Sequence, residues 1–284
     1  FMTLDDTFAL EKAINKDSNV LIVGAGLIGL KCAEGLHERV KSITVCDLAD
    51  RVLSSILDTD CAAIVQRHLE ANGIQFLLGD TAVRFEKNLA QMKSGKTVEF
   101  DTLVLAVGVR ANTTLIKEIG GEVNRGMLVN DRMETSLESI YAAGDCTEGN
   151  DISLGQKRVL ALLPNAYMQG HTAGVNMAGG NEVFGKAIPM NSIGFFGLHI
   201  MTAGTYEGEM YEEKSDSTLK RLFTKDGLLK GFILIGKTER AGIYTSLIRE
   251  RTPLDTIDFE TMKKVATSVA FSPENRRKKF GGVV

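Results

Sequence analysis

Hydrophobic positions in the first third of the chain alternate between short apolar runs and longer stretches with helical spacing. Val20–Val23 is apolar throughout, which predicts a strand covered on both faces. Leu27–Arg39 carries apolar residues at helical intervals and predicts a helix directly after it. A strand at Lys41–Cys46, a helix at Asp58–Asn72 and a strand at Ile74–Leu78 are predicted next. This alternation favours a parallel sheet with helices on its faces.

The pattern changes after these units. Short alternating runs between Thr81 and Phe100 predict a small antiparallel meander, and Thr102–Val107 predicts another buried strand. A later helix is predicted to begin at Pro164, because proline is tolerated in the first helical turn.

The last hundred residues, from Gly185 onwards, predict a mixed α+β unit. Two strands, Ser217–Thr224 and Leu228–Gly236, are expected to pair through a turn at Lys225–Gly227. Helices are predicted near Ala241–Glu250 and Phe259–Thr267.

Three glycines lie between the first strand and the first helix, in the turn Gly24-Ala25-Gly26-Leu27-Ile28-Gly29. In a dinucleotide-binding turn the first glycine permits the tight turn, the second lets a pyrophosphate approach the backbone, and the third lets the helix pack against the strand. Free N–H groups at the start of the helix then face the anion. Glycines at this spacing also occur in ordinary strand-helix-strand units, where they only tighten the turn.

An acidic residue, Asp47, follows the second predicted strand. A carboxylate at this place accepts hydrogen bonds from the ribose 2′-OH of an adenosine, which strengthens the nucleotide interpretation of the glycine turn. The same charge repels the additional phosphate of NADP, and the nearest arginine is Arg51. The sequence therefore favours NADH over NADPH.

Composition narrows the function further. The chain has 284 residues, 44% of them hydrophobic, with 33 basic and 36 acidic residues and a net charge of −3. These values predict a globular protein that binds neither nucleic acid nor an anionic membrane. The first residues, FMTLDDTFAL, lack the basic and apolar regions of a signal peptide, and we expect a cytoplasmic location. The scattered cysteines predict buried apolar side chains and no metal site; they are Cys32, Cys46, Cys61 and Cys146.

Several motifs occur in a fixed order: GAGLIG, CDLADRVL, DTLVLAVGVRANT, GMLVNDRMETSLESIYAAGDCTE and LLPNAYMQGHTAGVNMAG. In this order the sequence closely resembles the flavin-dependent pyridine nucleotide-disulfide oxidoreductase superfamily. The nearest branch is that of the NADH:rubredoxin reductases, nitrite reductases and NADH oxidases. The CxxC of thioredoxin reductases is absent, as is the His-Pro and Glu pair of glutathione-reductase-like enzymes.

The resemblance implies an α/β fold in which a Rossmann-like NAD-binding domain is inserted in an FAD-binding domain and followed by a small α+β C-terminal domain. The corresponding segments are 1–110, 111–184 and 185–284. The first half of the FAD domain would lie upstream of Phe1, and we expect the native chain to extend there by roughly 100 residues.

The resemblance also assigns cofactor contacts. Ile140–Ala143 would be a strand that ends at Gly144 and Asp145, with the Asp145 carboxylate on FAD, although most Gly-Asp pairs are plain turns. The backbone at Leu162, Leu163 and Pro164 would face the flavin pyrimidine edge, where a helix N-terminus favours the reduced, anionic ring. Val107 and Gly108, which end a predicted strand, complete the candidate cofactor contacts.

One residue departs from the family pattern. Lys31 lies where many relatives carry a glutamate that pairs with a lysine near the flavin. A branch difference, a reversed ion pair and a solvated helix lysine all account for it. No side-chain nucleophile is required for hydride transfer between two cofactors, so no catalytic residue is assigned.

The function implied by the resemblance is electron transfer from NADH through FAD to a small acceptor, such as rubredoxin or a ferredoxin. The alternatives are a module that senses NADH without turnover, and an enzyme that uses oxygen, peroxide or nitrite. The basic C-terminal segment SPENRRKKFGGVV either meets an acidic electron carrier or is a solvated terminus. The oligomeric state is left open.

Overall fold

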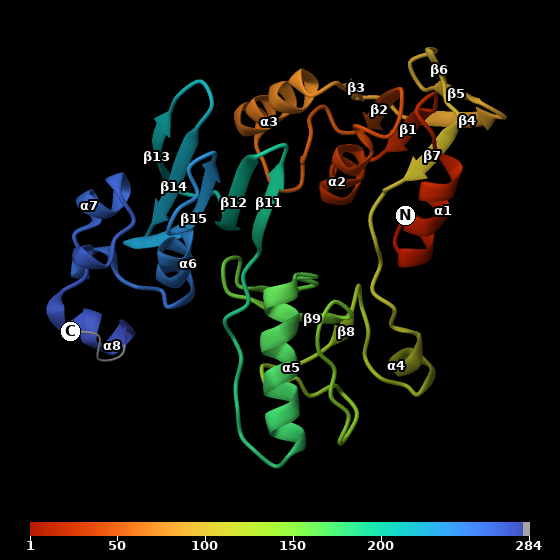
Figure 1. The fold of residues 1–284 in the computed structure, drawn as a ribbon. Helices are drawn as coiled ribbons and strands as arrows, with labels where there is room; N and C mark the ends of the chain where they lie inside the picture. The colour runs from red at the N-terminus through yellow and green to blue at the C-terminus, as the bar shows by residue number, and fades with distance from the viewer. Residues whose placement is uncertain (281–284) are drawn as a thin grey trace. The chain divides into compact units, whose positions relative to one another are not determined.

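The computed structural model describes the backbone of residues 1–280 and the side chains of residues 1–277 (Figure 1). The chain divides into two compact units. The first unit contains Phe1–Val109 and a short return segment, Ile193–His199. The second unit contains Arg110–Ser192 and the residues from Ile200 onwards.

The first unit is built on a parallel four-stranded sheet of order β3-β2-β1-β7. The central strand β1 pairs with a strand on each side, and Leu21 and Ile22 in it are fully buried, as its apolar run predicts. The predicted order of strands and helices is confirmed. The elements are α1 (Leu4–Ala13), β1 (Asn19–Val23), α2 (Leu27–Leu36), β2 (Ser42–Asp47), α3 (Thr59–Ala71), β3 (Ile74–Leu78) and β7 (Thr102–Leu105).

Helix α3 begins and ends where its sequence predicts. Asp58 accepts a hydrogen bond from the Cys61 N–H as N-cap, and Gly73 follows the helix with a φ of 83°. The predicted meander between β3 and β7 is a three-stranded antiparallel sheet, and Phe100 packs in a buried cluster that the meander shares with β1 and β2. Its strands are β4 (Ala82–Glu86), β5 (Leu89–Met92) and β6 (Thr97–Glu99).

In the second unit, helix α5 (Leu163–Met177) begins at Pro164 within one residue, as predicted. The helix buries polar side chains, among them Asn165 and Gln169, and exposes Leu163 and Tyr167. Short elements precede α5 in the chain, namely α4 (Thr114–Glu118), β8 (Met127–Leu128), β9 (Thr147–Asp151) and β10 (Gln156–Arg158).

The predicted strand at Ile140–Ala143 is wrong. The segment makes one isolated bridge, between Glu134 and Tyr141, and it belongs to no named strand. The backbone on either side of it is interrupted by left-handed residues, since Ser139 has a φ of 61° and Gly144 a φ of 87°. Strand formation needs a neighbour along its length, and no described strand pairs with this segment beyond that bridge.

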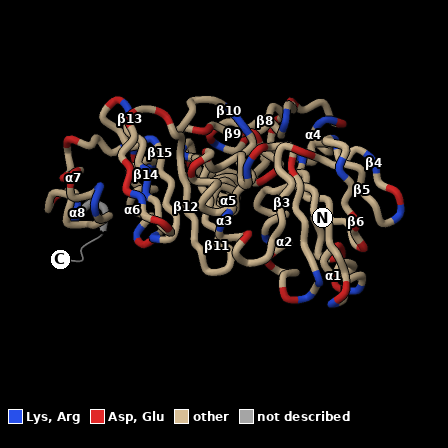
Figure 2. The backbone as a smooth tube through the Cα atoms, turned by 90° about the horizontal axis from the view of Figure 1, so that it is seen from above, with Lys and Arg blue, Asp and Glu red and all other residues tan. Residues whose placement is uncertain are grey.

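The C-terminal part contains a five-stranded sheet of order β11-β12-β15-β14-β13. The predicted hairpin is confirmed, with Asp226 and Gly227 both at positive φ in its two-residue turn. Charged pairs such as Glu212 with Arg221 join the edge strand to its neighbour, and Figure 2 marks these charges along both strands. The strands are β11 (Met190–Phe195), β12 (Leu198–Gly204), β13 (Glu209–Lys214), β14 (Leu219–Lys225) and β15 (Leu228–Ile235).

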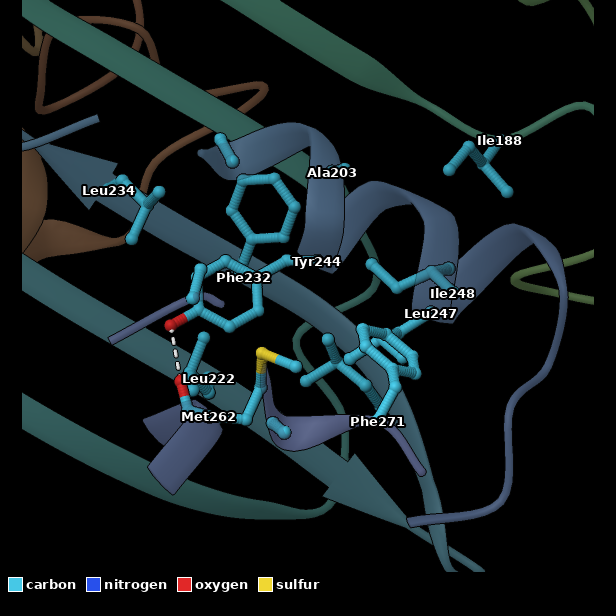
Figure 3. Packing of buried hydrophobic residues seen from close by; sticks show 14 residues of the cluster. Ile188, Ala203, Leu222, Phe232, Leu234, Tyr244, Leu247, Ile248, Met262 and Phe271 are labelled. Atoms are coloured by element: carbon cyan, nitrogen blue, oxygen red, sulfur yellow. Dashed lines mark hydrogen bonds between the residues drawn. The ribbon is translucent and has the colours of Figure 1, made fainter. Parts of the chain in front are cut away.

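Helix α6 (Ala241–Arg249) covers this sheet through buried apolar side chains (Figure 3). Tyr244 packs on Phe232, with ring centroids 5.7 Å apart, and its hydroxyl donates to the Met262 carbonyl at 2.7 Å. Burial raises the pKa of Tyr244 to about 12, so the hydroxyl stays a donor at neutral pH. The remaining elements are the 3₁₀ turns Leu254–Thr256 and Ser268–Ala270, α7 (Phe259–Lys264) and α8 (Pro273–Phe280).

Helix α7 ends three residues before its predicted boundary at Thr267. The Lys220 ammonium donates to the carbonyls of Lys263 and Lys264, which satisfies the last helical acceptors at that point. The basic C-terminal segment forms α8, and Gly281–Val284 of that segment lie outside the described residues. None of the helices described within residues 1–280 is both long and apolar enough to span a bilayer.

Candidate functional site

The turn after β1 has a shape that requires glycine at its first position. Gly24 has a φ of 115°, and a Cβ built on it would collide with the Ala106 carbonyl oxygen at the end of β7. Its N–H donates to the Cys46 carbonyl at 2.8 Å. The turn is therefore held between the two strands that flank β1.

The other two glycines of the turn serve different purposes. A Cβ on Gly29 would collide with the Gly24 carbonyl oxygen, so Gly29 lets α2 approach the strand. A Cβ on Gly26 would meet no atom within 4 Å. Gly26 is also the N-cap of α2, and no side chain caps the helix there. The first N–H groups of α2 therefore face open space and suit an anion.

A groove of about 440 Å³ opens at this point, at the carboxyl ends of the parallel strands. Seven of the predicted cofactor residues line it, and five residues that were not predicted also contribute. The lining residues are Val23, Gly24, Gly26, Leu27, Ile28, Asp47, Leu48, Ser55, Thr81, Ala106, Val107 and Gly108. The hydrophobic pattern gives no signal for Ser55, which lies in a turn between predicted elements, or for Thr81, which is the first residue of the predicted meander.

Asp47 has a second task that the sequence does not reveal. One carboxylate oxygen accepts the Ala25 N–H at 2.7 Å, and the other accepts the Ala49 N–H at 2.8 Å. The side chain therefore fixes the glycine turn to the loop after β2. Each carboxylate oxygen retains a lone pair for a further donor, and the side chain is partly exposed to the groove.

Three of the contacts predicted in this unit do not line the groove, namely Ala25, Arg51 and Gly29, the last of which lets α2 pack against the turn. Ala25 is 1% exposed and points into the core, where its N–H serves Asp47. Arg51 binds the Asp50 carboxylate and the Leu57 carbonyl, so its guanidinium holds its own loop together and does not reach the groove.

The second group of predicted contacts lies in the other unit. Gly144 and the first turn of α5 are neighbours, because a Cβ on Gly144 would lie 3.7 Å from the Ala166 side chain. Gln169 holds them together: its side-chain oxygen accepts the Gly144 N–H at 2.8 Å and the Thr147 hydroxyl at 3.0 Å. Gln169 lies in the helix predicted to begin at Pro164, and no role was predicted for it.

The backbone at the start of α5 remains open to a ligand. Leu162 is the N-cap and provides no side-chain hydrogen bond, Pro164 has no N–H, and Leu163 is 85% exposed. Asp145 is exposed beside this turn. Helix α5 has 15 residues and its N-terminus is uncapped, so its first turn suits an anionic or electron-rich group.

The cysteines are not arranged for dithiol chemistry. Cys32, Cys46 and Cys61 are buried, whereas Cys146 is partly exposed, so the expectation of full burial is wrong for that residue. Burial raises the pKa of Cys32 to about 11, which keeps this thiol protonated at neutral pH.

The fold and the groove define a nucleotide-binding α/β protein, and comparison with known proteins identifies its family. A model of the family described as pyridine nucleotide-disulphide oxidoreductase matches residues 1–170. The chain belongs to this family, and the resemblance inferred from its motifs is confirmed.

Two relatives illustrate the similarity. The NADH-dependent phenylglyoxylate dehydrogenase subunit epsilon of Aromatoleum evansii is 32% identical over 265 residues, covering 89% of this chain and 63% of the relative. The rubredoxin-NAD(+) reductase of Acinetobacter baylyi is 33% identical over 240 residues, covering 80% and 58%. The chain thus spans about three fifths of the length of these curated relatives.

A solved structure supports the fold. The putidaredoxin reductase in the covalent putidaredoxin reductase-putidaredoxin complex superposes with a TM-score of 0.83 at 19% identity, over 94% of this chain and 66% of that one. The predicted α/β class with its parallel and antiparallel sheets is confirmed.

Proposed function

We propose that the chain is the NAD-binding and C-terminal part of a flavin-dependent oxidoreductase that passes electrons from NADH through FAD to a small acceptor. The observation that carries the proposal is the groove at the start of α2, where Gly26 leaves space and Asp47 supplies a carboxylate. Residues 1–110 would form the NAD-binding domain, 111–184 the FAD-binding segment and 185–284 the C-terminal domain.

In this proposal the pyrophosphate of NADH lies against the first turn of α2, over Gly26, Leu27 and Ile28. Asp47 accepts the adenosine ribose hydroxyls, and its charge disfavours the 2′-phosphate of NADPH. Because Arg51 is bound to Asp50 and Leu57, no arginine described at this end of the groove offsets that repulsion.

FAD would be held by the second group of residues. Asp145 would accept hydrogen bonds from the ribityl or pyrophosphate part, and the uncapped start of α5 at Leu162–Pro164 would face the pyrimidine edge. The chemistry that such a pair of cofactors supplies is hydride transfer from dihydronicotinamide to the isoalloxazine ring. The chain itself contributes binding, orientation and a positive helix end for the reduced ring.

The acceptor would be a small redox protein, such as rubredoxin or a ferredoxin. Similarity to a rubredoxin-NAD(+) reductase favours this choice over oxygen, peroxide or nitrite. Free and mostly buried cysteines fit a reducing compartment such as the cytoplasm. A module that senses NADH without turnover is the alternative.

Two measurements test the proposal. Calorimetric titration of the 284-residue chain with NADH should give one site, and NADPH should bind more weakly. In the full-length protein, bound FAD should be bleached by NADH without oxygen and recover its colour on addition of rubredoxin, with oxygen, peroxide and nitrite compared in parallel, whereas the 284-residue chain alone should hold FAD weakly. A full-length protein that binds NADH and whose FAD is never bleached would be a sensor, and a chain that does not bind NADH would refute both.

A further inference from the structure

The return segment of the first unit, Ile193–His199, contains the tip of the β11–β12 hairpin. Its two-residue turn, Phe196 and Gly197, has φ values of 46° and 83°. Glycine adopts this left-handed conformation readily, but phenylalanine does not, so the surroundings must hold Phe196 in place.

Side chains from two helices bind the backbone of this tip. The Glu34 carboxylate of α2 accepts the Phe196 N–H at 2.6 Å. The Lys31 ammonium of α2 donates to the Gly194 carbonyl at 3.0 Å and forms an ion pair with Glu34. The Phe196 amide thus donates to a carboxylate and the Gly194 carbonyl accepts from an ammonium, and both charged groups lie on adjacent turns of α2.

Helix α3 contributes the third contact. His68 Nε2 lies 3.0 Å from the Phe195 carbonyl oxygen and 3.3 Å from that of Phe196. Since a carbonyl only accepts, Nε2 must carry the proton, and both the neutral and the charged imidazole can provide it. The contact therefore does not depend on the charge of His68.

Aromatic contacts complete the enclosure of the tip. Phe195 is fully buried, with the Lys31 ammonium 5.6 Å from its ring centroid. The Phe196 ring meets His37 edge to face, with centroids 5.0 Å apart. Lys31 therefore contacts Glu34, Gly194 and the Phe195 ring while its side chain stays half-exposed, so it is more than a solvated helix lysine.

The strand that leads into the tip borders α2 close to the nucleotide groove. An apolar groove of about 440 Å³ runs along α2 and is lined in part by Leu27, Ile28, Lys31, Cys32, Leu36 and Ile193. Leu27 and Ile28 line both this groove and the nucleotide groove. A dinucleotide whose pyrophosphate lies over Gly26, Leu27 and Ile28 would therefore border the groove that Ile193 lines.

We propose that Lys31, Glu34 and His68 are positioning residues that clamp the hairpin tip, Gly194–Gly197, onto α2 and keep Ile193 as a wall for the nicotinamide half of the bound dinucleotide. The clamp is read directly from the contacts of the tip. Its effect on the nucleotide rests on the proposed function.

Amide hydrogen exchange of the tip tests the clamp. Glu34→Ala should raise the exchange rate of the Phe196 amide by about tenfold, because it removes a charge-assisted acceptor. Glu34→Gln should stay close to the unmodified chain, since its amide oxygen still accepts. Glu260→Ala is the matched control, as it removes another ion pair between a glutamate and a lysine three residues away. Unchanged tip exchange in Glu34→Ala would overturn the proposal.

Two further variants keep the test decisive if Glu34→Ala also loosens α2 itself. Lys31→Met retains a long side chain over Phe195 and loses the bond to Gly194, and His68→Ala acts from α3. Both should accelerate exchange at residues 194–197 while the amides of β1 stay protected. If neither does so, the tip is not held by these side chains and the clamp is refuted.

Ligand titration of Glu34→Ala tests the wall. ADP-ribose lacks the nicotinamide, so its affinity should remain unchanged while the affinity for NADH falls severalfold. An equal loss for both ligands would overturn the role of Ile193 as a wall. Failure of ADP-ribose and NADH to bind even to the unmodified chain would instead refute the proposed function, and the exchange experiment would still decide on the clamp.

Discussion

The nucleotide groove and the segment from Gly144 to Pro164 hold their backbones in place by different means. In the groove, β1 pairs along its length with β2 and β7, and the turn that follows is packed against the Ala106 carbonyl. In the second segment, Ile140–Ala143 makes a single bridge, and Gly144 is held by the side chain of Gln169. Strand pairing and backbone packing, with Asp47 as an additional side-chain contact, therefore shape the first region, whereas short backbone turns and the Gln169 side chain shape the second.

The largest effect should follow from a change at Gly24. Gly24→Val would impose a branched side chain at a φ of 115° and drive it into the Ala106 carbonyl. Strain and collision together should lower the free energy of unfolding by more than about 3 kcal/mol. Urea denaturation followed by circular dichroism measures the loss. A variant as stable as the unmodified chain would contradict the view that backbone packing shapes this turn.

A second substitution, at Gly26, should change NADH affinity without changing stability. Gly26→Val places its side chain in open space, and the φ of −85° suits valine, so unfolding should change by less than about 1 kcal/mol. The side chain fills the space that a pyrophosphate needs, and NADH affinity should fall by at least about 100-fold. Calorimetry beside circular dichroism decides. Unchanged NADH affinity would mean that Gly26 only shapes the turn.

The sequence predicted the groove well because its signals are local. An apolar strand, three glycines and a helix with regular spacing follow one another directly, and Asp47 ends the next strand. Gly24, Gly26, Val107 and Gly108 accordingly line one groove. The double role of Asp47 was missed, because hydrogen bonds to Ala25 and Ala49 leave no trace in a hydrophobic pattern.

The second region was predicted less well for the same physical reason. An apolar tetrapeptide at Ile140–Ala143 reads as a strand, but a strand exists only where another strand pairs with it. Gln169 and the hairpin clamp at Lys31, Glu34 and His68 act through contacts between residues far apart in the chain. The spacing of hydrophobic residues predicts which face of an element is buried, but it does not predict hydrogen-bond partners that lie far apart in the chain.

Gln169 offers the test of the second region. Gln169→Leu keeps the volume and removes the acceptor for the Gly144 N–H, while the Thr147 hydroxyl keeps the Gly144 carbonyl as its acceptor, so the free energy of unfolding should fall by about 2 kcal/mol. Gln66→Leu on α3, which loses only a bond to the Glu70 side chain, is the control. NADH affinity should not change in either variant. Equal stability of Gln169→Leu and the unmodified chain would show that the segment is held by other contacts.

A substitution at Asp47 should have a smaller effect, and one that differs between NADH and NADPH. Asp47→Ala removes the ribose acceptor together with the hydrogen bonds from the Ala25 and Ala49 N–H groups, so NADH binding should weaken by at least about tenfold, while NADPH loses less because its phosphate is no longer repelled. Asp50→Ala, whose carboxylate binds Arg51, is the control. Titration with both nucleotides measures the ratio. Equal or tighter binding of NADPH by the unmodified chain would refute the assigned preference.

The smallest effect concerns the pH dependence of the clamp. Burial alone would raise the pKa of Glu34, but the hydrogen bonds from Lys31 and the Phe196 amide outweigh it, so the pKa lies below the ordinary 4.5. The unfolded chain therefore binds the proton more readily than the folded chain does. The stabilisation from Glu34 is complete above the unfolded-state pKa and is lost as the pH falls from about 4.5 through the folded-state value.

Because the Glu34 side chain is 23% exposed and paired with a half-exposed lysine, this stabilisation should be at most about 1 kcal/mol. Urea midpoints of Glu34→Gln and the unmodified chain should therefore differ most at pH 6, and the difference should shrink as the pH falls below 4.5. A constant difference across this range would show that the Glu34 charge contributes nothing to holding the tip, and only its shape would remain.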